Sequence, residues 1–194
     1  MALTKKTFRK ICLEKMKKAP KHNRNYKNNL VNNYLLDELK NVTNKKILFF
    51  YPLKFEPNIR RALLKLRKRN QIFLPFMEGT SFKVVPFRFP LTKKKFDIFE
   101  AGNTIRNIKK IDIAIVPAVG VDGNLQRIGF GKGMYDRFFA KLQKKPYTIF
   151  VQSEFCRTKE FICDHYDVKC DLLLTPKGRL ENKGTKDVKR NTTW

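Results

Sequence analysis

The run RIGFGKGMYDRF occupies residues 127–138 and places three glycines at alternate positions, Gly129, Gly131 and Gly133. The chain has only nine glycines, and five of them fall between residues 120 and 133. Glycine lets the backbone turn freely and come close to another group. We therefore expect a ligand to approach the main chain here. An apolar strand is predicted before the loop at residues 111–116, IDIAIV, and a helix after it at residues 134–143.

Strand and helix patterns alternate on both sides of this loop. Short apolar runs predict strands at residues 47–51, 71–76, 81–88, 147–152 and 170–175. Amphipathic spacing predicts helices at residues 3–18, 26–39 and 59–67, with Thr4 as the cap of the first. Pro86 places the strand at residues 81–88 near an edge of the sheet. The alternation predicts one α/β domain with a mainly parallel sheet over residues 1–178, followed by a polar C-terminal tail, residues 179–194.

The glycine loop has the features of an anion site. The start of a helix offers unpaired N–H groups, and glycines let several amides turn toward one anion. Lys132 and Arg127 would add positive charge. Asp136, in the first helical turn, either complements the helix dipole or binds Mg²⁺. The spacing is neither a Walker loop nor G-x-G-x-x-G, so a tight turn without a ligand remains the alternative.

The composition narrows the class of protein. The formal net charge of +26 favours anionic partners, although lysine is spread along the chain rather than gathered in one stripe. No apolar run approaches the roughly 20 residues of a membrane span, and the basic N-terminus lacks the apolar middle of a signal peptide. We expect a cytoplasmic protein that does not bind membranes. The four cysteines form no C-x-x-C pair. The regular spacing of the last three is open to a metal site or a disulfide, but we predict that all four are reduced.

The stretch AIVPAVGVDGNLQRIGFGKGMYDRFF, residues 114–139, resembles the signature of the 5-formyltetrahydrofolate cyclo-ligase family. That signature is a strand, a proline, an aspartate five residues on, and then R-x-G-x-G-x-G-x-Y-D-R. Pro117 and Asp122 match its first part, and residues 127–137 match the rest. The chain departs from the family at Ala118, Val121, Leu125 and Met134, which affects the expected shape of the pocket more than the reaction.

Three further segments resemble the family. KKTFR near the start matches its K-x-x-x-R helix through Lys5 and Arg9, and YPLKFEP matches its folate-contacting loop through Glu56. A carboxylate suits a pterin because it can accept hydrogen bonds from a ring N–H and an amino group together, although Glu56 is also a common residue at a helix start. DVKCDLLLTPKG matches the closing strand of the family, led by Asp167.

The resemblance implies a three-layer α/β/α fold that is Rossmann-like, of the NagB/RpiA/CoA-transferase type. It implies ATP- and Mg²⁺-dependent closure of 5-formyltetrahydrofolate, which can carry a polyglutamate tail, by a monomer. The implied catalytic residues are Lys132 and Arg127, and the implied metal ligands are Asp136 and Asp167. The implied ATP-binding residues are Lys5, Lys6, Arg9, Arg127, Gly129, Phe130, Gly131, Lys132, Gly133, Met134 and Tyr135. The implied substrate-binding residues are Tyr51, Glu56, Phe130, Met134 and Tyr135.

Two other functions stay open at this point. The excess of basic residues mixed with aromatics also fits a nucleic-acid-binding protein, although we expect no specific nucleic-acid partner. The departure at Met134 also fits a catalytically inactive relative that retains folate binding. The joint presence of Lys132, Asp136, Glu56 and Asp167 argues against the inactive relative.

Overall fold

The computed structural model describes residues 2–93, 99–103, 108 and 110–182 of the 194-residue chain. Its central sheet has seven strands: β1 (Lys46–Leu48), β2 (Gln71–Glu78), β3 (Ser81–Pro86), β6 (Ile113–Pro117), β9 (Tyr147–Val151), β10 (Leu172–Thr175) and β11 (Gly178–Glu181). Their order is β11-β10-β9-β6-β1-β2-β3. Neighbours from β10 to β2 are parallel, and the edge strands β3 and β11 are antiparallel to the strands beside them. The predicted mainly parallel sheet and the edge position of the Pro86 strand are both confirmed.

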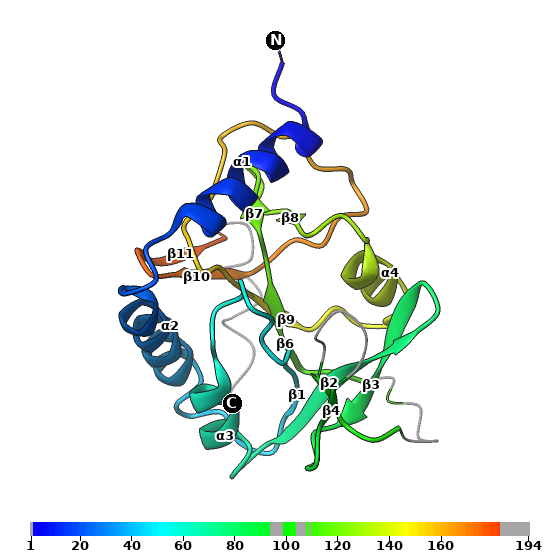
Figure 1. The fold of residues 1–194 in the computed structure, drawn as a ribbon. Coiled ribbons are helices and arrows are strands. Elements are labelled where there is room, and N and C mark those ends of the chain that lie inside the picture. The colour runs from blue at the N-terminus through cyan, green and yellow to red at the C-terminus, as the bar shows by residue number, and fades with distance from the viewer. Residues whose placement is uncertain (1, 94–98, 104–107, 109, 183–194) are drawn as a thin grey trace.

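The described part of the chain has four helices around the sheet, α1 (Lys5–Lys18), α2 (Arg24–Glu38), α3 (Arg60–Leu66) and α4 (Met134–Ala140). The β6 strand is buried along its whole length because both of its faces are covered. Ile113 and Ile115 belong to the core cluster that α2 and α3 complete, whereas Ala114 and Val116 belong to the cluster that includes α4. Figure 1 shows these helices on opposite sides of the sheet. The predicted three-layer α/β/α architecture is confirmed.

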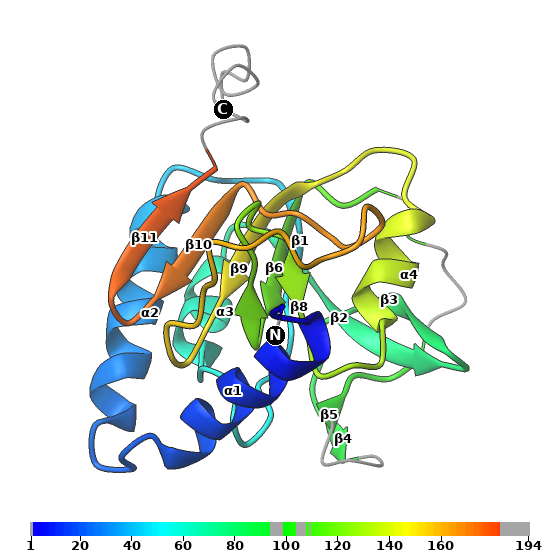
Figure 2. The ribbon, with the colours of Figure 1, turned by 90° about the horizontal axis from the view of Figure 1, so that it is seen from above.

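Helix α1 covers the carboxyl end of β6. The chain leaves β6 at Pro117 and enters the hairpin of β7 (Gly120–Val121) and β8 (Arg127–Ile128). Phe8 and Cys12, on the buried side of α1, pack with Val119 and Ile128 of this hairpin region. Figures 1 and 2 both show α1 lying over β7 and β8. Ligands of open α/β sheets bind at this end of the strands, so α1 is placed to contact one.

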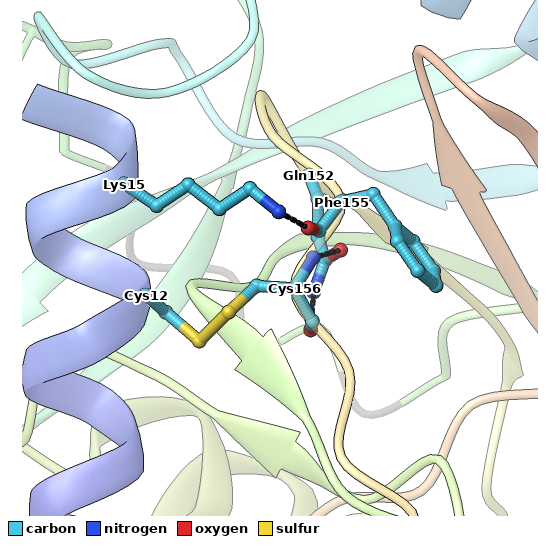
Figure 3. The surroundings of a disulfide bond; sticks show 5 residues. All are labelled: Cys12, Lys15, Gln152, Phe155 and Cys156. Carbon is cyan, nitrogen blue, oxygen red and sulfur yellow. Dashed lines mark hydrogen bonds between the residues drawn. A yellow bond between two sulfur atoms is a disulfide. The ribbon is translucent and has the colours of Figure 1, made fainter. Parts of the chain in front are cut away.

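The predicted reduced state of all four cysteines is wrong for two of them. Cys12 of α1 and Cys156, which follows β9, form a disulfide with a Cα–Cα distance of 5.8 Å across 144 residues of sequence (Figure 3). The side chain of Gln152 holds the backbone of Cys156 through two hydrogen bonds of 3.0 Å. Oε1 of Gln152 accepts from the N–H of Cys156, and Nε2 donates to the carbonyl oxygen of Cys156. Local spacing gives no sign of this pair because only the tertiary fold brings the two segments together.

The sheet ends later than the sequence predicts. Residues 179–181 were expected in the polar tail, but β11 pairs them with β10, with Leu180 opposite Leu173. An edge strand with one exposed face alternates half-buried and exposed residues, and this polar pattern resembles a tail in the sequence. Residues 183–194 lie outside the described part of the chain. Besides the β7–β8 hairpin, a second small sheet pairs β4 (Thr92–Lys93) with β5 (Phe99–Glu100). No described helix is both long and apolar enough to cross a membrane.

Candidate active site

The glycine loop joins β8 to α4, and each of its three glycines has a structural reason. Gly131 has a φ of 102° and Gly133, the N-cap of α4, has a φ of 59°, a region that side chains with a Cβ rarely adopt. Position 129 favours glycine because the Arg127 side chain comes close to its backbone. A Cβ there would lie 2.4 Å from Nη1 of Arg127. Helix α4 has only seven residues, so charge at the loop comes mainly from side chains and loop amides.

A cavity of about 450 Å³ opens beside the loop, a size within the usual range of small-molecule sites. Its lining is made of basic side chains, loop glycines, two carboxylates, an alanine and one tyrosine: Lys5, Arg9, Arg127, Gly129, Gly131, Lys132, Gly133, Asp136, Arg137, Ala140, Tyr166 and Asp167. Nine of the residues predicted from the sequence lie on this list, from three separate segments of the chain. The cavity is therefore strongly cationic and suited to a polyanion.

Helix α1 supplies one wall of the cavity. Thr4 caps it by accepting a hydrogen bond of 3.1 Å from the N–H of Thr7, as predicted. Arg9 donates from Nε to the carbonyl oxygen of Gly129 at 2.9 Å. Lys5, one turn earlier, forms ion pairs with Asp167 and, at 3.1 Å, with Asp164. Lys6 is exposed and does not line the cavity, because neighbouring residues of a helix point in different directions.

Asp136 and Asp167, the predicted metal ligands, both line the cavity. Asp136 lies in the first turn of α4, where Oδ1 accepts from the N–H of Val168 at 3.3 Å. Asp167 has a side chain only 3% exposed, and its Oδ2 accepts from Lys5 and, at 2.7 Å, from the N–H of Asp164. Among the described residues, no group of three or more His, Cys, Asp or Glu is arranged as a metal site. Two carboxylates fit Mg²⁺, which commonly completes its shell with water and substrate phosphates.

Arg127 connects this cavity with Glu56 in the interior. The guanidinium is buried, donates from Nε to the carbonyl oxygen of Pro117 at 2.9 Å, and lies 4.6 Å from the Tyr135 ring centroid. Glu56 is also buried and accepts from the N–H of Leu53 at 2.9 Å. Burial raises the pKa of Glu56 to about 7, against the opposing effects of this hydrogen bond and of the Arg127 charge. Burial also raises the pKa of Tyr135, and the Glu56 charge adds to the rise.

Besides Lys6, Glu56 and Tyr135, three other predicted residues do not line the cavity. Tyr51 packs against the α2–α3 core, and its hydroxyl accepts from Nη1 of Arg60 at 3.2 Å. Met134 packs against the core on the α4 side of the sheet, and Phe130 is 42% exposed in the loop. Packing therefore accounts for Tyr51 and Met134 without a ligand. The continuous motif predicts Phe130 in the site together with its neighbours, but the loop bends at residues 130–132 and leaves this side chain outside the cavity lining.

The sequence did not predict a role at the site for Arg137, Asp164 or Tyr166. Arg137 donates from Nε to the carbonyl oxygen of Thr80 at 2.8 Å and from Nη2 to that of Lys132, so it ties the loop to the β2–β3 hairpin. Arg137 is the last residue of the family signature, and this position could have indicated a role at the site. Asp164 and Tyr166 precede Asp167 in the segment between β9 and β10. Tyr166 lines the cavity and Asp164 pairs with Lys5, and both positions depend on how this segment folds.

Comparisons with known proteins agree with this geometry. A model of the 5-formyltetrahydrofolate cyclo-ligase family matches residues 2–176. The chain is 29% identical over 135 residues to the 5-formyltetrahydrofolate cyclo-ligase of Mycoplasma genitalium, covering 68% of this chain and 80% of that protein. It is 28% identical over 130 residues to the Mycoplasma pneumoniae protein of the same name, covering 67% and 72%.

A solved structure shares the fold. The 5,10-methenyltetrahydrofolate synthetase of Aquifex aeolicus superposes with a TM-score of 0.72 at 23% identity, over 93% of this chain and 94% of that one. The family model spans both α1 and the glycine loop, and it ends one residue after β10. The segments that line the cavity therefore all fall inside the match, and the chain belongs to the 5-formyltetrahydrofolate cyclo-ligase family.

Proposed function

We propose that this chain uses ATP and Mg²⁺ to close 5-formyltetrahydrofolate into 5,10-methenyltetrahydrofolate, with release of ADP and phosphate. The observation that carries the proposal is the single cavity in which α1, the glycine loop and the Asp167 segment bring together cations, glycines and two carboxylates. We also propose a monomer as the active unit. Family membership supports the folate reaction.

The chemical problem is that an N-formyl oxygen is a poor leaving group. In the proposed reaction the formyl oxygen attacks the γ-phosphorus of ATP, and ADP leaves. The neighbouring secondary amine then attacks the activated formyl carbon, loses its proton, and the former formyl oxygen departs with phosphate. Phosphoryl transfer requires mainly positioning and neutralisation of charge. The lining of the cavity is suited to both.

The phosphates would be held by the loop and by α1. The amides around Gly129, Gly131 and Gly133 would contact phosphate oxygens, because these three residues carry no side chains of their own. Lys132 of the loop and Arg9 of α1 line the same cavity and would neutralise phosphate oxygens. Arg127 is buried below the loop, so we assign it the role of supporting the loop and Glu56 rather than that of a mobile catalytic cation.

Asp136 and Asp167 would hold the metal, and Mg²⁺ when bound supplies neutralisation of the phosphate oxygens. Both carboxylates line the cavity. The ammonium group of Lys5 forms an ion pair with Asp167. Lys5 therefore places a positive charge beside this nearly buried carboxylate.

Glu56 would hold the pterin. Its carboxylate is buried beside the Arg127 charge, and an ionised carboxylate can accept from two adjacent N–H donors at once. A folate bound there would bring its formyl group toward Arg127 and the loop, where the phosphoryl group is transferred.

The test is a spectrophotometric assay with purified protein, 5-formyltetrahydrofolate, Mg²⁺ and ATP. We expect the near-ultraviolet absorbance of the methenyl product to grow only when ATP is present, and ADP to form in equal amount. Product without ATP, or ATP hydrolysis without product, would contradict the proposal. A reaction without enzyme corrects for spontaneous cyclisation.

A further inference from the structure

We propose that Tyr166 is the surface on which the base of the nucleotide stacks, an inference that rests on the proposed function. Tyr166 lines the cavity and is 63% exposed. Among the described residues that line this cavity it is the one aromatic side chain; the rest are cations, carboxylates, glycines and an alanine. A nucleotide has a charged end and a flat, weakly polar end. The cations suit the first, and Tyr166 suits the second.

The Tyr166 ring is held in place although it is exposed. The nearby Asp164 carboxylate interacts with its hydroxyl and raises the pKa of the phenol. The His165 ring packs against it edge-on, with centroids 5.2 Å apart and planes at 78°. A base that stacks on a ring already fixed in this way loses little side-chain freedom of the protein.

Tyr166 also lies close to a lysine that could contact the triphosphate. The Lys5 ammonium is 5.8 Å from the ring centroid and is bonded to Asp167, the neighbour of Tyr166 in sequence. Lys5 is thus close both to the flat surface and to a proposed metal ligand. A triphosphate that contacts Lys5 would carry its base toward Tyr166.

Stacking on a side chain adds affinity without reading the hydrogen-bonding edges of a base. We therefore expect Tyr166 to favour nucleotides over base-free phosphates and to discriminate little between adenine and guanine. This expectation separates a stacking role from a general contribution to the charge of the cavity.

The experiment compares Mg·ATP with Mg·tripolyphosphate, which lacks the base and ribose, by isothermal titration calorimetry. Tyr166→Ala should weaken ATP binding at least about fivefold, the lower end of the effect of one stacked base. Tripolyphosphate binding should stay within about twofold of the parent protein. Tyr166→Phe keeps the ring and should retain most of the ATP affinity. Phe161→Ala is the matched control, since Phe161 is 72% exposed in the same segment but does not line the cavity.

A spectroscopic variant gives an independent readout. The chain has one tryptophan, Trp194, so Tyr166→Trp in a Trp194→Phe background carries a single indole at the proposed surface. ATP should quench its fluorescence, whereas tripolyphosphate should not.

Three results would overturn the proposal. Unchanged ATP affinity in Tyr166→Ala would show that the base lies elsewhere, with the phosphate site intact. Equal losses for ATP and tripolyphosphate would show that Tyr166 acts through Lys5 and Asp164 rather than by stacking. If the parent protein bound neither ligand, the proposed function would fail, and the proposal for Tyr166 would fail with it.

Discussion

Arg9 of α1 donates a hydrogen bond of 2.9 Å to the carbonyl oxygen of Gly129, 120 residues further along the chain. This bond joins the two walls of the cavity, because α1 carries Lys5 and Gly129 begins the loop that carries Lys132. It also turns one loop carbonyl toward a cation rather than toward the cavity, where it would repel a phosphate. The N-terminal helix is therefore part of the site and not an appendage of the domain.

Gly129→Ala should damage the loop through Arg127. A Cβ at residue 129 would lie 2.4 Å from Nη1 of a buried guanidinium, so either Arg127 or the loop must shift. We expect a loss of about 1–3 kcal/mol in unfolding free energy and at least a tenfold loss of ATP affinity, measured by urea unfolding and calorimetry. Gly102→Ala is the control because nothing lies within 4 Å of a Cβ there. Equal behaviour of the two variants would refute the assigned close approach.

Lys132→Ala should lower turnover while leaving folate binding intact. Lys132 lines the cavity, and a group that neutralises charge developing in the transition state typically contributes about 10²-fold or more to kcat. Steady-state kinetics should therefore show a fall of this order in kcat, with the KM for the folate within about twofold. Lys141→Ala, an exposed lysine at the end of α4 that does not line the cavity, is the matched control. Normal kcat in Lys132→Ala would remove this lysine from the mechanism.

Glu56→Gln should change how stability depends on pH. The pKa of Glu56 is raised from 4.5 to about 7, so its ionised form is less favourable in the folded state. The contribution of Glu56 to the free energy of unfolding is therefore greatest below pH 4.5. It falls as the pH rises through 7, by roughly 3 kcal/mol at most. Urea unfolding should show Glu56→Gln gaining on the parent protein between pH 5 and pH 8. The exposed Glu160→Gln should show no such change, and a pH-independent difference for Glu56→Gln would contradict the burial argument.

The disulfide between Cys12 and Cys156 should stabilise the attachment of α1. Removing a cross-link across 144 residues frees the unfolded chain and typically lowers stability by about 2–4 kcal/mol. Cys12→Ser with Cys156→Ser should show this loss in urea unfolding without reductant, and a reductant should bring the parent protein to the same value. Cys163→Ser removes a free thiol and should leave the response to reductant unchanged.

Thiol titration of the unfolded protein decides the same point directly. Without reductant we expect two reactive thiols, those of Cys163 and Cys170. Four thiols in protein kept from reductant would show that Cys12 and Cys156 are not linked.

The sequence predicted the sheet well because buried parallel strands are continuous apolar runs. The IDIAIV run became β6, with Ile115 and Val116 on opposite faces of one strand. Thr4 was identifiable as a cap because its hydroxyl acts locally, within three residues. The glycine loop was identifiable because a positive φ such as that of Gly131 is a local property that favours glycine.

What the sequence did not show depends on contacts between distant segments. The Cys12–Cys156 bond and the position of Tyr166 beside Lys5 arise only when α1 packs on the β7–β8 hairpin. The continuous sequence motifs also led to predicted site residues that do not line the cavity. Lys6 and Phe130 are neighbours of cavity residues in sequence but do not line the cavity, because adjacent side chains diverge on a helix and the loop bends at residues 130–132.

A crystal structure with Mg²⁺ and a non-hydrolysable ATP analogue tests the central claim most directly. The account predicts the triphosphate against the amides of residues 129–133, the metal between Asp136 and Asp167, and the base on Tyr166. A triphosphate bound away from the glycine loop, with the cavity beside α1 left without phosphate, would contradict it.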